Sequence, residues 1–205
     1  MRLLPAIFAM AAVVLASNIL VQFLCGPWLT WGAFTYPFAF LVTDLTNRIL
    51  GPGAARRVVV WGFVTGLICS AIGSQIQGAA GPLTTVRIAL GSATAFLVAQ
   101  LLDIAVFNRL RAGSWWRAPL LSTLVSSTID TVIFFCLAFS ATLAFIEPGN
   151  DVSWASQVVP MLGSGPMVPF WVSLALADWG VKLLLAIVAL LPFRMAVTRL
   201  TARLA

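Results

Sequence analysis

The sequence predicts an all-α, polytopic membrane protein, a bundle of six transmembrane helices with both termini in the cytoplasm. Hydrophobic residues make up 61% of the 205 residues, charged residues only 9%, and the mean hydropathy is +1.03. A soluble domain usually carries about a quarter charged residues, so that class is excluded. The apolar residues also fall into six stretches, and the arginines lie at alternate ends of these stretches. We expect residues 1–205 to form a single membrane domain embedded in the lipid bilayer.

The apolar stretches are each close to the ~20 residues that cross the hydrocarbon core as a helix. They cover residues 3–24, 31–50, 58–77, 85–107, 119–145 and 167–191. The first is too long for the apolar part of a signal peptide, and no small-x-small cleavage site follows it, so we expect it to remain as a span. The second begins after a short connection that contains no basic residue.

The third stretch contains Gly62 and Gly66, a spacing that lets a neighbouring helix approach closely. We interpret it as packing within the chain, with a homodimer contact as the alternative. The fourth has a basic cluster at its end. The fifth is long enough to tilt or to extend past the bilayer. The sixth follows a long connection, residues 147–166, which is rich in Pro, Gly and Ser and is expected to lack regular structure over much of its length.

The distribution of arginines predicts the orientation. Those at or beyond the ends of the spans are Arg2, Arg48, Arg56, Arg57, Arg109, Arg111, Arg117, Arg194, Arg199 and Arg203, and they lie at alternate ends of successive spans. The opposite connections, residues 26–30, 78–84 and 147–166, contain no Lys or Arg. Cytoplasmic loops carry the excess of basic residues, so both termini are expected on the cytoplasmic side of the inner membrane.

Several chemistries are excluded by composition. The chain has no histidine, so it cannot carry a Ser-His-Asp or Cys-His catalytic group. Its one lysine, Lys182, follows no Gly-rich phosphate-binding loop. Cys25, Cys69 and Cys136 are too far apart for a zinc or iron–sulfur site, so we expect no metal and no cofactor. The net charge of +6 reflects membrane topology, not a nucleic-acid partner.

Ionisable residues inside the spans are the main functional signal, because each costs several kcal/mol unless it is paired or hydrated. They are Asp44, Arg87, Asp103, Asp130, Asp178 and Lys182. The i,i+4 spacings of Asp44 with Arg48 and of Asp178 with Lys182 predict ion pairs on one helix face. For both spacings a functional role stays open beside the structural one. Asp103 is interpreted as structural, within reach of Arg109.

Asp130 differs because no basic residue lies within a turn of it on its own stretch. Ser126, Ser127, Thr128 and Thr131 make its surroundings polar. A partner must come from another helix, from water or from a ligand, and we favour a ligand or proton role. Asn18 and Gln22 share one face of the first stretch, and Gln100 lies close to Asp103 on the fourth. Together these side chains indicate a hydrophilic cavity suited to a polar small molecule.

Several segments carry a family resemblance. They are residues 31–44, which include Thr-Tyr-Pro and Thr-Asp, Gly51, residues 54–57, Arg87, residues 100–111, residues 115–119, residues 122–124, Asp130 with Thr131, Phe134 with Phe135, Lys182 and Pro192. This pattern resembles the VUT family of queuosine-precursor transporters, once called vitamin uptake transporters, and covers most of the chain. Many family members have an acidic residue four positions after the Thr-Asp aspartate, whereas this chain has Arg48, as in the proteobacterial branch.

The resemblance implies import of 7-deazaguanine precursors of queuosine, chiefly 7-cyano-7-deazaguanine and also its aminomethyl relative. A buried carboxylate can accept hydrogen bonds from the N–H edge of such a ring, and an arginine or amide can donate to its carbonyl. The hypothesis is that Asp130 or Asp44 reads the N–H edge, and that the site is completed by Asn18, Gln22, Gln100 or Arg87. Asp178, Lys182, Arg48 and Asp103 are left as coupling or ion-pair candidates.

Other functions stay open at this point. The chain has no nucleotide site, so it is a secondary carrier, a facilitator, or a substrate-capture subunit for another vitamin-like solute energised by a separate module. A membrane-embedded enzyme is disfavoured, because each span has at most one aspartate and no Gly-x-Gly-Asp segment is present. A purely structural subunit would tolerate neutral replacement of Asp130, which a transporter should not.

Overall fold

The computed structural model describes residues 3–78 and 81–202, so Arg2 and Arg203 of the predicted orientation pattern lie outside the described residues. The described part is mainly helical. Its α-helices are α1 (Leu4–Leu20), α2 (Gly32–Thr35), α3 (Phe38–Leu50), α4 (Pro52–Gly73), α5 (Val86–Leu110), α6 (Arg117–Phe139) and α7 (Phe170–Ala202). Four of them, α4 to α7, are long and apolar enough to cross a membrane. The first predicted span corresponds to the shorter, apolar α1.

The connections contain short strands and 3-10 turns. Antiparallel pairs are formed by β1 (Leu24–Cys25) with β2 (Leu29–Thr30), β3 (Gln77–Gly78) with β4 (Gly81–Pro82), and β5 (Val158–Pro160) with β6 (Met167–Pro169). The 3-10 helices are η1 (Ala141–Ile146), η2 (Ser153–Ser156) and η3 (Met161–Gly163). The long connection before α7 therefore has more local structure than its composition predicts. Within it, hydrogen bonds from the Ser153 side chain and backbone hold the pKa of Asp151 below its usual value.

Several helix boundaries differ from the apolar stretches. The second stretch is divided into α2 and α3 at Pro37. The helix of the third stretch, α4, begins at Pro52, six residues before the predicted start at residue 58. Gly51 takes a left-handed φ of +86°, and Pro52 is suited to the first turn of a helix. Helix α6 ends at Phe139, and the rest of the fifth stretch is 3-10. Helix α7 continues past Pro192 to Ala202.

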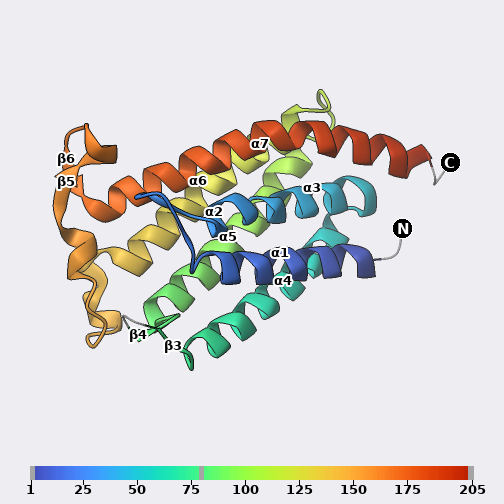
Figure 1. Ribbon diagram of the computed structural model, residues 1–205. Helices are drawn as coiled ribbons and strands as arrows, with labels where there is room; N and C mark the ends of the chain where they lie inside the picture. Colours follow the sequence, from blue (N-terminus) through green and yellow to red (C-terminus); the bar gives the residue numbers. More distant parts are fainter. Residues whose placement is uncertain (1–2, 79–80, 203–205) are drawn as a thin grey trace.

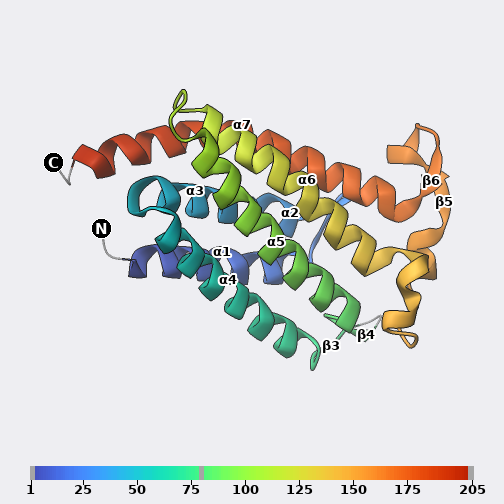
Figure 2. The same ribbon diagram turned by 180° about the vertical axis from the view of Figure 1, so that it is seen from behind.

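The two ends of the bundle differ in character (Figure 1). The N- and C-terminal parts, the α3–α4 junction at Gly51 and the α5–α6 turn lie at one end. The hairpins β3–β4 and β5–β6 lie at the opposite end, and the same division is seen from behind (Figure 2). The described arginines of the orientation pattern belong to the first end. We call the two ends the arginine end and the hairpin end.

The glycine pair of α4 packs inside the chain. A Cβ at Gly62 would meet the Met10 side chain at 2.6 Å and the Phe96 ring at 2.9 Å, so only glycine fits between α1, α4 and α5 without a shift. Gly66 faces Val14 of α1 at an ordinary contact distance of 3.7 Å. The prediction of close packing within the chain is thus confirmed. Helix α4 lies on the side of the bundle away from α7, as Figure 2 shows.

Candidate functional site

Helix α6 carries a ladder of buried polar side chains through the bundle. Ser122, Ser126 and Asp130 are spaced by four residues and share one face, while Thr123, Ser127 and Thr131 form the adjacent row. All six are at most 5% exposed. At 1.5 Å per residue the ladder is about 12 Å long. Each of its ends meets a separate cluster of ionisable side chains.

The cluster toward the hairpin end, here called the Asp130 centre, consists of Tyr36, Asp130, Thr131, Asp178 and Lys182. The Lys182 ammonium lies 2.7 Å from Asp130 Oδ2 and 2.5 Å from Asp178 Oδ2, and it donates to Thr131 Oγ1 at 2.9 Å. Tyr36 donates its hydroxyl to Asp130 Oδ1 at 2.9 Å. Thr131 Oγ1 donates to Asp178 Oδ2 at 3.2 Å. Two carboxylates thus share one ammonium, and both Asp130 oxygens have partners.

Pro37 explains how Tyr36 reaches Asp130. Proline has no N–H to donate, so the helical ladder is interrupted between α2 and α3. Ala39 N–H bonds to the Tyr36 carbonyl at 2.9 Å, one residue short of α-helical spacing. The break places Tyr36 at the junction, where its hydroxyl faces α6. Discontinuous helices of this kind commonly build the binding sites of transporters near the bilayer midplane.

The cluster toward the arginine end, the Asp44 centre, consists of Thr43, Asp44, Asn47, Gln100 and Asp103. It contacts the ladder through Thr123 Oγ1, 3.5 Å from Asp44 Oδ2, and through Ser126 Oγ, 3.1 Å from Asp103 Oδ1. Thr43 donates to Gln100 Oε1 at 2.5 Å. Through these contacts to α6 the carboxyl groups of Asp44 and Asp103 lie close to each other. All five residues are at most 3% exposed.

The Asp44 centre is incompletely satisfied. Among the described residues, Asp44 Oδ1, Asp103 Oδ2, Asn47 Oδ1 and Gln100 Nε2 are buried without a hydrogen-bond partner. No described lysine or arginine nitrogen lies within 4.0 Å of either carboxylate. A buried polar group without a partner costs about 1–3 kcal/mol, and more when it is charged. Such a cluster is where a ligand, an ion or a proton can supply the missing bonds.

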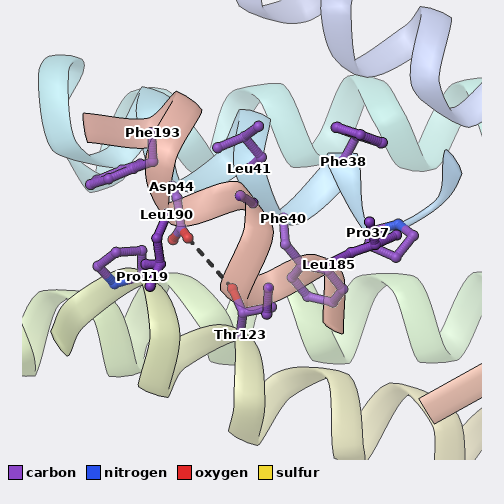
Figure 3. Close-up of a pocket in the computed structure, with 12 residues that line it drawn as sticks. Pro37, Phe38, Phe40, Leu41, Asp44, Pro119, Thr123, Leu185, Leu190 and Phe193 are labelled. Carbon is purple, nitrogen blue, oxygen red and sulfur yellow. Dashed lines mark hydrogen bonds between the residues drawn. The ribbon is translucent and has the colours of Figure 1, made fainter. Parts of the chain in front are cut away.

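A small cavity adjoins Asp44 between α3, α6 and α7 (Figure 3). Its volume of about 20 Å³ has room for roughly one water molecule. Asp44 and Thr123 supply its polar wall, and their hydrogen bond is drawn in Figure 3. The remaining wall is apolar and includes Phe40, Leu190 and Phe193. We call it the Asp44 cavity.

The predicted ion pairs have different outcomes. Asp178 and Lys182 form theirs, and Asp130, which has no basic residue near it on its own helix, joins the pair from α6. The predicted pair of Asp44 with Arg48 is wrong, because Arg48 Nη1 donates to the Arg111 carbonyl at 3.1 Å instead.

The pairing expected for Asp103 with Arg109 is wrong as well, because Arg109 lies exposed on α5. Arg111, not Arg109, binds back to α3, through its guanidinium to the Asn47 and Arg48 carbonyls at 2.8 Å. The arginines at this end of α3 and α5 therefore bind backbone carbonyls and leave both carboxylates of the Asp44 centre unpaired.

Three predicted site residues lie away from both centres. Asn18 donates to the Val14 carbonyl of its own helix at 2.9 Å, and Gln22 is exposed beyond the end of α1. Arg87 is fully buried, but its guanidinium donates to the Leu137 and Ser140 carbonyls at the end of α6. It therefore clamps α5 to α6. Gln100, in contrast, lies in the Asp44 centre as the hydrophilic-cavity argument expects.

Sequence reasoning gave no role to Tyr36, Thr43 or Asn47. Tyr36 carried one usable signal, because it is the only tyrosine of the chain and it precedes a proline in the middle of an apolar stretch. Thr43 and Asn47 carried no such signal, since a threonine or asparagine beside an intramembrane aspartate often has no functional role. Their positions depend on α5, more than 50 residues further along the chain.

Both centres fall within the region that matches a known family. The model of the family described as "Putative vitamin uptake transporter" matches residues 30–197. The chain belongs to this family. It is 38% identical over 194 residues to the Escherichia coli K12 protein named "Queuosine precursor transporter", an alignment that covers 88% of this chain and 79% of that protein.

Two further relatives cover shorter regions. The Haemophilus influenzae protein named "Probable queuosine precursor transporter" is 43% identical over 121 residues, or 54% of this chain and 52% of its own length. The Bacillus subtilis protein of the same name is 34% identical over 130 residues, 54% of this chain and 56% of its own. No solved structure matches the chain significantly. The family and the apolar helices together make this VUT member a multi-pass membrane protein.

Proposed function

We propose that this VUT member imports 7-deazaguanine precursors of queuosine, 7-cyano-7-deazaguanine and its aminomethyl relative, across the inner membrane. The observation that carries the proposal is the 38% identity, over 88% of the chain, to a protein named for transport of queuosine precursors. The buried polar centres support it, because a transporter for a hydrogen-bonding solute needs polar groups inside an apolar bundle.

We further propose six spans with both termini in the cytoplasm. Helix α1 and the α2–α3 unit are the two spans beyond the four long helices. Both run along the bundle between its two ends, which supports this count (Figure 1). The orientation is supported by the arginine end, where the described basic residues of the connections gather beside the terminal parts of the chain.

The Asp44 centre is the proposed reading site for the ring. The guanine-like edge of a 7-deazaguanine presents a ring N–H and an amino group beside a carbonyl. The unpartnered oxygens of Asp44 and Asp103 can accept from the two donors, and the unpartnered Gln100 Nε2 can donate to the carbonyl. The apolar wall of the cavity, with Phe40 and Phe193, suits the faces of a planar ring.

Substrate entry requires movement of the helices. Cavities that hold drug-sized ligands measure about 300–1,000 Å³, far more than the 20 Å³ present here. Helix α7 supplies Leu185, Ala186, Ala189, Leu190 and Phe193 to the wall, so its separation from α3 and α6 would open the cavity most directly.

The Asp130 centre has a different proposed role. Its carboxylates already have partners, so we propose that it positions the α2–α3 junction against α6 and α7 and does not read the ring edge. The hypothesis that Asp130 itself binds the ring thus gives way to Asp44. Asp178 and Lys182 belong to the same positioning unit, and Arg48 does not pair with Asp44.

The experiment that tests the function uses cells unable to synthesise 7-cyano-7-deazaguanine and lacking other importers. The chain is expressed, 7-cyano-7-deazaguanine is supplied, and queuosine in transfer RNA is measured. We expect queuosine to be restored by the wild-type chain and not by an empty vector. Absence of queuosine, with the protein present in the membrane, would contradict the proposed substrate.

Reconstitution distinguishes a carrier from a capture subunit. Purified protein in liposomes is expected to move labelled 7-cyano-7-deazaguanine without any other protein. Binding without transport, together with co-purification of an ATPase, would favour the capture subunit.

A further inference from the structure

A second, larger cavity lies at the arginine end and shares one wall with the Asp44 cavity. Its volume is about 240 Å³, and it is lined by Arg48, Trp115, Phe193, Arg194, Val197 and Thr198. We call it the arginine vestibule. Phe193 is the one residue that lines both cavities. In Figure 3 its ring lies beside Asp44 and Leu190.

Phe193 is held in place by apolar packing. It is 3% exposed, lies edge-on to the Phe107 ring with 6.2 Å between the ring centres, and clusters with Ala118. No hydrogen bond or charge fixes the ring, so it can move at the expense of packing alone. The ring lies in the wall that the two cavities have in common.

Pro192 supplies a hinge beside this ring. Proline removes one hydrogen bond from the helix and is a common cause of kinks. It lies within α7, which continues for ten residues beyond it to Ala202. Bending at this point would carry Phe193 and Arg194 together relative to α3 and α6. The hinge, the ring and the wall of the vestibule are therefore consecutive residues.

The vestibule has the chemistry to hold a planar heteroaromatic molecule. The Arg194 guanidinium lies 4.9 Å from the centre of the Trp115 ring, which provides an aromatic face and a cation in one place. Arg48 uses Nη1 for the Arg111 carbonyl, and the guanidinium has further N–H donors. None of the lining residues is acidic. Donors beside an aromatic face suit a ring that carries carbonyl or nitrile acceptors.

We propose that the arginine vestibule is a second binding position for the planar heteroaromatic substrate, and that Phe193 is the gate between it and the Asp44 cavity. The identity of the ring rests on the proposed function, whereas the gate does not. The substrate passes from the carboxylates at Asp44, which read its N–H donors, to arginines that serve its acceptors.

Cysteine labelling tests the gate without any substrate. Cys25, Cys69 and Cys136 are replaced by serine, and Ala189→Cys places one thiol in the wall of the Asp44 cavity. Phe193→Ala should raise its rate of reaction with a membrane-impermeant methanethiosulfonate about tenfold or more. Leu191→Ala is the matched control, because Leu191 is 66% exposed and lines neither cavity. Inside-out and right-side-out vesicles are both used, so an error in the proposed orientation cannot hide the effect.

A second thiol separates gating from unfolding. Ala99→Cys is fully buried on α5 and lines neither cavity, so it should stay unreactive in every variant. If Phe193→Ala makes it reactive, the milder Phe193→Leu decides. A rise at position 189 but not at 99 supports the gate. An unchanged rate at position 189 in both Phe193 variants, or a rise at both positions with leucine, overturns it.

Transport kinetics test the vestibule as a binding position. Arg194→Gln and Trp115→Ala should each raise the KM for 7-cyano-7-deazaguanine about tenfold, the scale of one lost polar or stacking contact. Arg199→Gln removes the same charge from the same end without touching the vestibule and should leave KM unchanged. An unchanged KM in both test variants overturns the second position. If the wild-type chain moves no 7-cyano-7-deazaguanine at all, the proposed function fails, and the labelling result still stands.

Discussion

The two polar centres lie on the same buried face of α6, about two helical turns apart, and differ in how well their groups are satisfied. In the Asp130 centre one ammonium lies between two carboxylates, and Tyr36 and Thr131 complete the hydrogen bonds. In the Asp44 centre two carboxylates lie side by side without a cation, next to a cavity. Four polar atoms there have no partner among the described residues.

The difference distinguishes two roles of a charged residue inside the membrane, one structural and one in ligand binding. A network in which every group has a partner fixes neighbouring helices in one arrangement. A buried group without a partner is unfavourable until something supplies the missing bond. An aspartate with unmet hydrogen-bonding capacity therefore indicates a binding site better than the mere presence of an aspartate in a span. By that measure we propose the binding site at Asp44, with the Asp130 centre positioning the helices around it.

The largest expected effect is on the stability of the Asp130 centre. Lys182→Met removes its only cation and leaves Asp130 and Asp178 buried against each other. Breaking a buried ion pair from one side typically costs about 3–5 kcal/mol, so we expect most folded protein to be lost. The measurement is thermal unfolding of purified protein in detergent. Adding Asp178→Asn to Lys182→Met should restore part of the loss, and a stable Lys182→Met protein would contradict the role of the centre.

The opposite pattern is expected at the Asp44 centre. Asp44→Asn should reduce uptake of 7-cyano-7-deazaguanine on the order of a hundredfold, or about 3 kcal/mol, because one charge-assisted hydrogen bond to the ring is lost. Its unfolding temperature should not fall, since neutralising one of two adjacent carboxylates removes a repulsion. Uptake and thermal unfolding are measured on the same preparation. Retained uptake together with lower stability would make Asp44 a structural residue.

A smaller effect is expected at the α2–α3 junction. Tyr36→Phe deletes one hydrogen bond to a charged carboxylate and leaves the ring in place. Bonds of this kind contribute about 1.5–3 kcal/mol, which sets the expected loss in the free energy of unfolding. Phe34→Leu, at a half-buried apolar position two residues earlier, is the control. Equal stability of Tyr36→Phe and the wild type would show that the junction does not depend on Asp130.

The smallest effect is expected from Arg48→Gln. In the structure Arg48 binds a carbonyl and not Asp44, so its loss should lower the free energy of unfolding by about 1 kcal/mol. An ion pair with Asp44 would instead predict about 3–5 kcal/mol, because a buried charge would be left alone. Chemical or thermal unfolding distinguishes the two values. The larger loss would mean that Asp44 is paired with Arg48, so that the two centres would no longer differ in how their carboxylates are satisfied.

The local part of the site was predictable from sequence. Asp178 and Lys182 obey the i,i+4 rule because both lie well inside one helix, where no loop carbonyl competes. Arg48 lies near the end of α3, and the turn after α5 offers it a carbonyl instead. Asp103 meets Asp44 only through the packing of α3 against α5, which no local spacing encodes.

The same limit applies to the helix ends. The apolar pattern ends at residue 191, directly before Pro192, yet α7 continues to Ala202. In membrane helices, neighbouring groups can satisfy the carbonyl that a proline leaves free, so proline there does not end a helix. The division of the second stretch at Pro37 shows the other outcome for the same residue type. Tertiary contacts decide between the two.

The most direct test of the contrast is equilibrium binding of 7-cyano-7-deazaguanine to two purified variants, Asp44→Asn and Asp130→Asn, compared with the wild type. Each dissociation constant is referred to the folded fraction of its preparation. We predict that Asp44→Asn loses measurable binding, while the folded fraction of Asp130→Asn binds within a few-fold of the wild type. Wild-type binding by Asp44→Asn together with lost binding by folded Asp130→Asn would contradict the account and place the ring at the Asp130 centre.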